Sequence, residues 1–185
     1  LTYPDVVQRS LYSMFEFGSS RVGRDAEAIL YFGNRITYGE LMDDVHAFAA
    51  GLVSLGVKKG DFVTICLPNM PQCVVAVYAV NRIGAVCNLV HPLSTKKEIA
   101  DAVRLCDSKV ILTFEMNEGH AEGLGAQIIR CATPEFFPKN PKGLVMKSVY
   151  NFSVRKAART PGAVSWASVM ESGRKFLEKH PLPKD

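Results

Sequence analysis

The spacing of apolar residues predicts a helix in the first third of the chain. Four apolar residues recur every three to four positions and so share one helical face: Leu41, Val45, Phe48 and Leu52. Just before them, Thr37 and Glu40 have the spacing of a capping box, in which each side chain accepts the other residue's backbone N–H. We expect Gly56 to end the helix, with Val57 packing back in a Schellman motif.

Two uninterrupted apolar runs, at residues 62–67 and 85–90, predict strands that are buried on both faces. The segment between them runs to residue 83, has Asn69 as its candidate N-cap, and is apolar nearly all round, which predicts a buried helix. A second capping box, at Thr95 and Glu98, begins another helix. Further expected elements are strands at 109–114 and 127–131 and a weak helix at 117–125. This alternation predicts an α/β fold with a mostly parallel, doubly wound sheet flanked by helices.

A helix and a short N-terminal β-hairpin are predicted before these elements. The helix is expected over residues 6–17, and the hairpin strands over 28–32 and 35–38. Gly33 and Asn34 would form the two-residue turn, because glycine at the first position suits a type II′ turn.

The character of the sequence changes after Cys131. Residues 1–133 are expected to form the α/β subdomain, and residues 134–185 a proline-rich loop, a basic helical segment at 144–159 and a lead-in to a further subdomain. No acidic residue occurs from 136 to 170, where six basic residues are found: Lys139, Lys142, Lys147, Arg155, Lys156 and Arg159. This stretch fits either a solvated basic face or a surface that meets an acidic partner domain or a phosphate group.

Composition narrows the class of protein further. A net charge of +4 with 22% charged residues lacks the dense basic stripe of a nucleic-acid-binding protein, so no nucleic-acid partner is expected. The five cysteines form no C-x-x-C, which favours a reducing, cytoplasmic setting and argues against a metal site. The uncharged run at 62–81 contains Pro68, Asn69 and Pro71, so no transmembrane segment is predicted.

Motifs for nucleotide binding or nucleophilic catalysis are not found in the sequence. It contains no G-x-x-x-x-G-K-[ST], no G-x-G-x-x-G and no G-x-S-x-G. His46 is predicted to be exposed, and the adjacent carboxylates of Asp43 and Asp44 point apart on their helix. His91 follows a parallel strand, where open α/β sheets place their ligands. We therefore predict no catalytic, cofactor-binding or metal-ligating residue, and a crevice edge near His91.

Four segments in order resemble the adenylate-forming superfamily of acyl-CoA synthetases, luciferases and peptide-synthetase adenylation domains. Residues 35–41 (R-I-T-Y-G-E-L) resemble its T-Y-x-E-L element. Residues 56–61 (G-V-K-K-G-D), 63–71 (V-T-I-C-L-P-N-M-P) and 81–86 (N-R-I-G-A-V) are similar to the segments that follow it. The resemblance covers roughly residues 11–131. It is specific because the four segments occur in the family's order and spacing.

The resemblance implies the N-terminal part of an AMP-forming acid–CoA ligase. The parent enzyme would join a carboxylic acid, fatty or aryl, to CoA through an acyl-adenylate, using ATP, Mg²⁺ and CoA. CoA ligases often carry Asn-Pro where this chain has His91-Pro92, and this loop borders the acyl and CoA channel in some relatives. His91, Pro92, Leu93 and Ser94 are therefore candidates for the edge of the substrate channel.

The family's phosphate loop would follow the segment that residues 166–175 resemble, and it is not found before Asp185. We therefore expect an inactive fragment without cofactor, whose partners are the downstream subdomains of the same chain and which exposes an apolar patch and self-associates. Two alternatives stay open: a stand-alone, non-catalytic α/β binding module, and a fragment of a peptide-synthetase adenylation domain.

Overall fold

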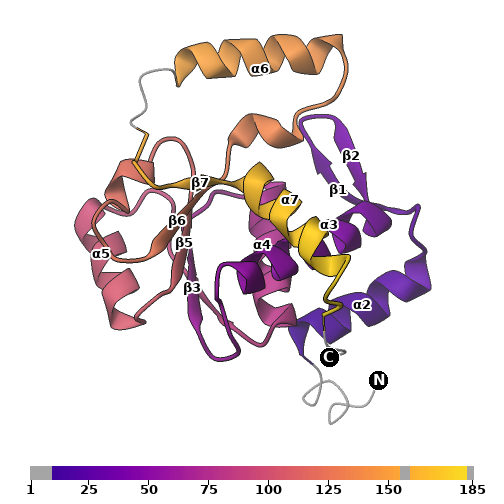
Figure 1. Cartoon of the computed structure of the whole chain (residues 1–185). Coiled ribbons are helices and arrows are strands. Elements are labelled where there is room, and N and C mark those ends of the chain that lie inside the picture. Colours follow the sequence, from indigo (N-terminus) through magenta and orange to yellow (C-terminus); the bar gives the residue numbers. More distant parts are fainter. Residues whose placement is uncertain (1–9, 155–158, 183–185) are drawn as a thin grey trace.

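The computed structural model describes residues 10–154 and 159–182, in which helices surround one five-stranded sheet and one hairpin (Figure 1). The α-helices are α2 (Leu11–Val22), α3 (Tyr38–Ser54), α4 (Pro71–Arg82), α5 (Lys96–Leu105), α6 (Pro141–Ser153) and α7 (Trp166–Leu177). The strands are β1 (Glu27–Tyr31), β2 (Asn34–Thr37), β3 (Phe62–Ile65), β4 (Val86–Leu89), β5 (Val110–Thr113), β6 (Gln127–Arg130) and β7 (Val164–Ser165). Two 3₁₀ turns are η1 (Glu118–His120) and η2 (Thr133–Phe136).

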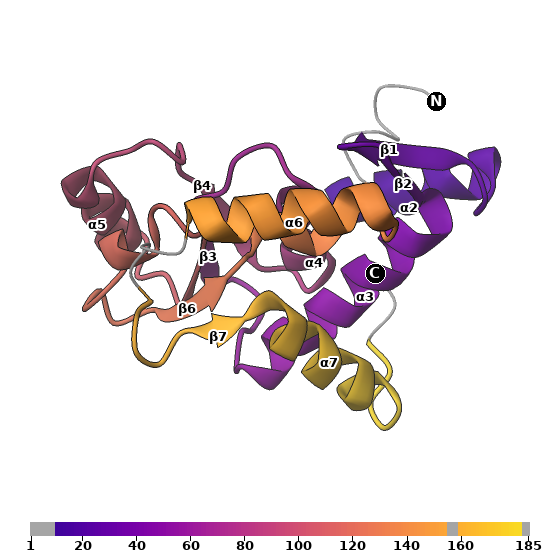
Figure 2. The same cartoon turned by 90° about the horizontal axis from the view of Figure 1, so that it is seen from above.

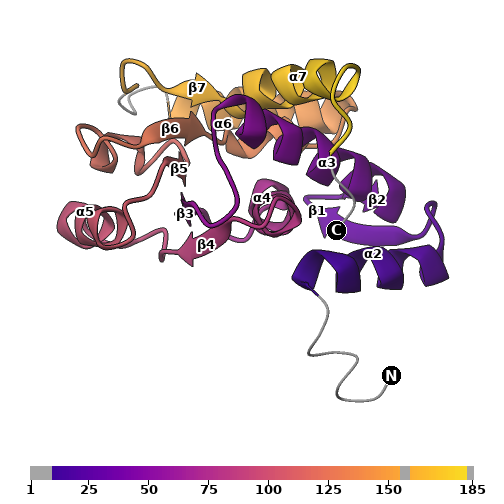
Figure 3. The same cartoon turned by 60° about the horizontal axis from the view of Figure 1, so that its bottom comes forward.

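The large sheet is parallel throughout and has the strand order β4-β3-β5-β6-β7. Helices cover both of its faces (Figure 3). Successive residues of a strand face opposite ways. Val110 and Leu112 of β5 accordingly join the core beneath α3 and α4, while Ile111 joins the smaller core beneath α5. The doubly wound α/β fold predicted from the sequence is confirmed.

The predicted helix ends are confirmed where the signal is local. Thr37 and Glu40 form a complete capping box on α3, and Thr95 and Glu98 form one on α5. The Val57 amide donates to the Leu52 carbonyl at 3.1 Å, which closes α3 as a Schellman motif does. Within the described part of the chain, the helices are too short or too polar to cross a bilayer.

The N-terminal region corrects two predictions. The hairpin turn consists of Phe32 and Gly33, which both have positive φ (50° and 83°), so it resembles type I′ rather than the expected type II′ turn at Gly33-Asn34. Helix α2 begins after the Ser10 cap and continues to Val22, well beyond the expected end at residue 17. Residues 6–9 of the predicted helix lie outside the described residues.

At four further places the structure differs from what the sequence pattern predicts. Met70 rather than Asn69 precedes α4, and Pro71 at its first position removes one amide that would need a cap. Strand β4 lies at the sheet edge, so Val86 and Leu89 are 40% and 65% exposed although the run was predicted to be buried. The expected helix at 117–125 is only the 3₁₀ turn η1, and strand β7 was not predicted.

Helices α3 and α7 cross at van der Waals distance because each presents a glycine to the other. A Cβ on Gly173 of α7 would lie 1.8 Å from the Ala47 carbonyl oxygen, and one on Gly51 of α3 would lie 2.5 Å from the Val169 carbonyl oxygen. The close approach lets Trp166 stack on Phe48 with ring centroids 4.1 Å apart. The crossing therefore joins the C-terminal helix to the first half of the chain.

We predict that Gly173→Ala lowers the free energy of unfolding by about 1–3 kcal/mol, because the added methyl group must push the two backbones apart. The exposed neighbour Ser172 offers a matched control, since Ser172→Ala adds the same residue to the same helix where nothing obstructs it. Alanine favours a helix over both glycine and serine. Urea unfolding that shows both variants to be as stable as the parent would contradict the tight crossing.

Candidate functional site

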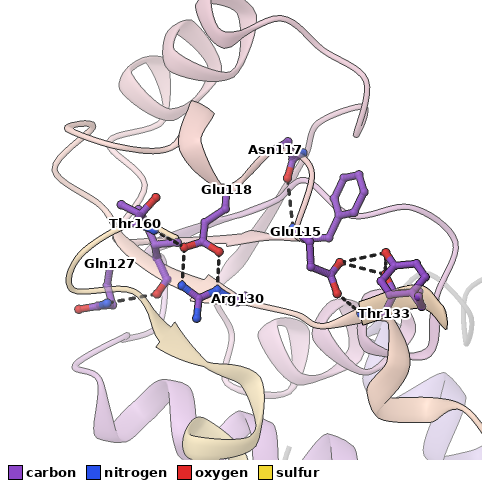
Figure 4. Close-up of polar contacts among 10 residues, drawn as sticks. Glu115, Asn117, Glu118, Gln127, Arg130, Thr133 and Thr160 are labelled. Atoms are coloured by element: carbon purple, nitrogen blue, oxygen red, sulfur yellow. Dashed lines mark hydrogen bonds and ion pairs between the residues drawn. The ribbon is translucent and has the colours of Figure 1, made fainter. Parts of the chain in front are cut away.

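Polar side chains gather where the parallel strands end, which is the edge at which open α/β sheets bind ligands. Figure 4 shows the centre of this region. This region consists of three segments: the loop 91–94 after β4, the residues after β5, and the residues around the end of β6. They are tied together by hydrogen bonds between segments far apart in the sequence.

The loop 91–94, predicted as a channel edge, lies at this end of the sheet with its backbone held in a turn. The His91 carbonyl accepts the Ser94 amide at 3.0 Å, and His91 Nδ1 accepts the Leu93 amide at 3.2 Å. The side chain of Leu93 is 78% exposed. The loop thus presents one apolar side chain from a fixed backbone, and the His91 ring is engaged in its own turn.

Asn117 fixes this loop to the neighbouring strand. Its side chain is buried; Nδ2 donates to the Pro92 carbonyl at 3.2 Å and to Cys66 Sγ at 3.1 Å, and Oδ1 accepts the Phe114 amide at 3.1 Å. One amide therefore joins the ends of β3, β4 and β5. Asn117 was not singled out from the sequence, although a polar residue close after a buried strand is the signal that would have found it.

Glu118 and Arg130 form a buried ion pair with two contacts, from Arg130 Nε to Glu118 Oε2 and from Nη2 to Oε1, the latter at 2.6 Å. The Glu118 side chain is 1% exposed, and it also accepts the Thr160 amide at 2.7 Å. Burial alone would raise the pKa of Glu118, but the Arg130 hydrogen bonds and the Thr160 amide hold it below the usual carboxyl value. The pair thus remains charged and joins η1, β6 and the segment before β7 (Figure 4).

Glu115 attaches α6 to the same edge. Its carboxylate accepts the Thr133 amide at 2.8 Å and the Thr133 hydroxyl at 3.1 Å. The Tyr150 hydroxyl of α6 lies 2.9 Å from Thr133 Oγ1 and 3.3 Å from Glu115 Oε2. Glu115, Thr133 and Tyr150 were not singled out from the sequence, because nothing in its spacing brings residue 150 to residue 115.

Glu135 is the one carboxyl group of this edge whose pKa approaches neutrality in the described structure. Gln72, at the start of α4, is fully buried and donates from Nε2 to Glu135 Oε2 at 3.1 Å and to the Ala132 carbonyl at 3.0 Å. Burial raises the pKa of Glu135 to about 7, and the nearby Glu115 carboxylate adds to the effect against the opposing Gln72 hydrogen bond.

Other residues considered from the sequence lie elsewhere. His46 was predicted to be exposed, but α2 covers it and the Tyr12 hydroxyl lies 2.6 Å from its Nε2. Asp43 and Asp44 point apart as predicted: Asp43 pairs with Arg24 at 2.7 Å and Asp44 with Arg174 at 3.2 Å. Within residues 10–154 and 159–182, no group of three or more His, Cys, Asp or Glu side chains has an arrangement that would hold a metal ion.

Removal of the Arg130 side chain should strongly destabilise the fold. We expect Arg130→Met to lower the free energy of unfolding by about 3–5 kcal/mol, because the buried Glu118 carboxyl group then loses its ionic partner. Arg104→Met is the matched control, since Arg104 pairs with Asp101 at 3.8 Å on the exposed face of α5 and should contribute less than about 1 kcal/mol. The addition of Glu118→Gln to Arg130→Met should recover part of the loss, and urea unfolding that shows none of these differences would refute the assignment.

Glu135 should make stability depend on pH. Its pKa in the folded state, about 7, lies above its usual value of 4.5, so its contribution to stability is present at acid pH and is lost as pH rises from about 4.5 through 7. Glu135→Gln should therefore match the parent near pH 5 and be more stable by roughly 1–3 kcal/mol at pH 8. Urea unfolding at both pH values measures this. The exposed Glu122→Gln is the control, and an equal response of both variants would exclude burial of Glu135 as the cause.

Comparisons with known proteins identify relatives of this fold. A family model described as "AMP-binding enzyme" matches residues 17–174. The acetyl-coenzyme A synthetase of Shewanella baltica is 34% identical over 168 residues, which are 83% of this chain and 24% of that protein. The structure of the anthranilate CoA ligase AuaEII with anthranoyl-AMP superposes with a TM-score of 0.68 at 14% identity, over 88% of this chain and 28% of that one. Acetoacetyl-CoA synthetase from Streptomyces lividans gives a TM-score of 0.65 at 21% identity, over 86% and 24% of the two chains.

These matches agree on the region that they cover. The chain spans about a quarter of the length of the relatives that it matches. The two solved structures share the fold, and the family model extends over most of the chain, including the four segments whose resemblance was noted in the sequence. The chain belongs to the AMP-binding enzyme family.

Proposed function

We propose that this chain is the N-terminal part of an AMP-forming acid–CoA ligase that acts in the cytoplasm. The parent would convert a carboxylate, ATP and CoA into acyl-CoA, AMP and diphosphate. The observation that carries the proposal is the 34% identity to acetyl-coenzyme A synthetase over 83% of the chain. The five cysteines, all free and partly or fully buried, fit a reducing compartment.

Within this proposal, residues 1–185 form a wall of the active site and leave nucleotide binding to other parts of the parent. A phosphate group binds at a helix N-terminus whose amides are free and whose first turn is not acidic. The N-termini of α3 and α5 do not fit ATP, because the carboxylates of Glu40 and Glu98 already occupy their terminal amides. We assign the residues that bind ATP and Mg²⁺ to other parts of the parent, together with those that hold CoA beyond the channel edge.

The loop 91–94 is proposed as the edge of the acyl and CoA channel. In its favour are its place at the carboxyl end of β4, the fixed backbone that Asn117 supports, and the exposed side chain of Leu93. A carboxylic acid substrate that passes this edge would meet an apolar contact at Leu93 rather than a charged group.

The 185-residue chain should neither bind ATP tightly nor catalyse acyl-CoA formation. Isothermal titration with Mg-ATP should give no saturable heat. Micromolar binding would contradict the assignment of ATP binding to other parts of the parent. The gene beyond the codon for Asp185 gives the second test. A Gly/Ser/Thr-rich stretch ending in Pro-Lys within a few tens of residues would support the ligase, whereas a stop codon would support a stand-alone binding module.

A further inference from the structure

Helix α6 runs across the outside of the molecule and is set apart from the large sheet (Figures 1 and 2). Gly143 packs on the loop that leads into the helix, so closely that a Cβ there would lie 1.7 Å from the Pro138 carbonyl oxygen. One turn before the end of the helix, the Tyr150 hydroxyl lies 2.9 Å from Thr133 Oγ1. The Tyr150 contact with η2 sets which face of α6 points outward.

The outward face of α6 is apolar. Val145, Val149 and Phe152 have the i, i+4, i+7 spacing of one helical stripe and are 64%, 62% and 72% exposed. Leu144 beside them is 64% exposed. Single exposed apolar side chains are ordinary, but a contiguous group on one short helix marks a surface that contacts something apolar.

The sequence around this stripe is basic. From residue 136 to 170 the sequence has no aspartate or glutamate, while Lys139, Lys142, Lys147 and Arg159 are exposed. Arg155 and Lys156 add two more positive charges to the sequence just after the helix. An apolar face flanked by lysine and arginine on an outer helix is the pattern of helices that bind in the plane of an anionic membrane surface.

We propose that the Leu144–Val145–Val149–Phe152 face of α6 docks on an anionic lipid bilayer, with the four apolar side chains among the acyl chains and the lysines at lipid phosphates. The four apolar residues are exposed, and none of them lines the groove of about 700 Å³ beside α6, to which Lys139 and Lys147 contribute. The absence of acidic residues from 136 to 170 opposes symmetric pairing of this face with a second copy, whose own lysines would face these. The proposal takes an anionic bilayer, rather than a downstream subdomain of the parent, as the occupant of this face, and it does not depend on the ligase activity.

Vesicle binding by the full 185-residue chain tests this proposal. The chain should co-sediment with phosphatidylcholine vesicles that contain about one third phosphatidylglycerol and not with pure phosphatidylcholine, and added salt should weaken the binding. Phe152→Trp supplies a direct readout, because the native Trp166 is buried against Phe48 and should not respond. Its emission should shift to the blue with the anionic vesicles alone.

Matched variants distinguish vesicle binding through this face from non-specific hydrophobic or electrostatic binding elsewhere on the protein. Val145→Ser/Val149→Ser/Phe152→Ser should weaken binding roughly tenfold or more, whereas Leu105→Ser, which changes an apolar side chain that is 88% exposed on α5, should not. Lys142→Glu should also weaken binding. Lys96→Glu is its control, because both lysines lie in the first turn of a helix, where a carboxylate is tolerated.

Three outcomes would overturn the proposal. They are failure of the parent chain to bind anionic vesicles at low salt, equal binding to neutral vesicles, and equal loss in the stripe variant and Leu105→Ser. Light scattering gives a fourth: concentration-dependent dimers that the triple serine variant abolishes would assign the face to a second copy. Unchanged far-UV circular dichroism confirms that each variant is folded.

Discussion

Burial of the Glu118 carboxylate is possible only because three groups from separate segments converge on it. Arg130 reaches it from β6 and the Thr160 amide from the segment before β7, while Glu118 itself lies in η1. An unpaired carboxylate at this depth would be protonated or would unfold its surroundings. The ion pair therefore fixes where the chain returns to the sheet after α6, and so where β7 and α7 begin.

The polar residues around this pair transmit the same constraint along the sheet edge. Asn117 lies next to Glu118 and holds the Pro92 carbonyl, so the loop 91–94 is fixed relative to β5. On the other side, Glu115 holds Thr133 and through it Tyr150 of α6. Both surfaces proposed to be functional, the channel edge and the membrane-facing helix, thus take their positions from hydrogen bonds that begin within four residues after the end of β5.

The sequence predicted what depends on neighbouring residues and missed what depends on distant ones. The capping boxes and the alternation of strands and helices are local, because Thr37 needs only Glu40 three residues later. The position of β4 at the sheet edge depends on strand order, which periodicity does not encode, and so the exposure of Leu89 was not foreseen. The polar contacts of the site join residues up to 63 positions apart, as between Gln72 and the Glu135 carboxylate. Only the loop at His91 could be placed, because strand polarity alone puts it at the carboxyl edge.

The features that stabilise this wall also limit the chemistry that it can carry out. A carboxylate in the first turn of a helix favours the helix by interacting with its dipole and its terminal amides. The same carboxylate repels a phosphate from those amides, so the capping boxes of Glu40 and Glu98 stabilise α3 and α5 and close two places where a nucleotide could bind. In this family member, the exposed Leu93 and the outward face of α6 are the surfaces proposed to meet other molecules.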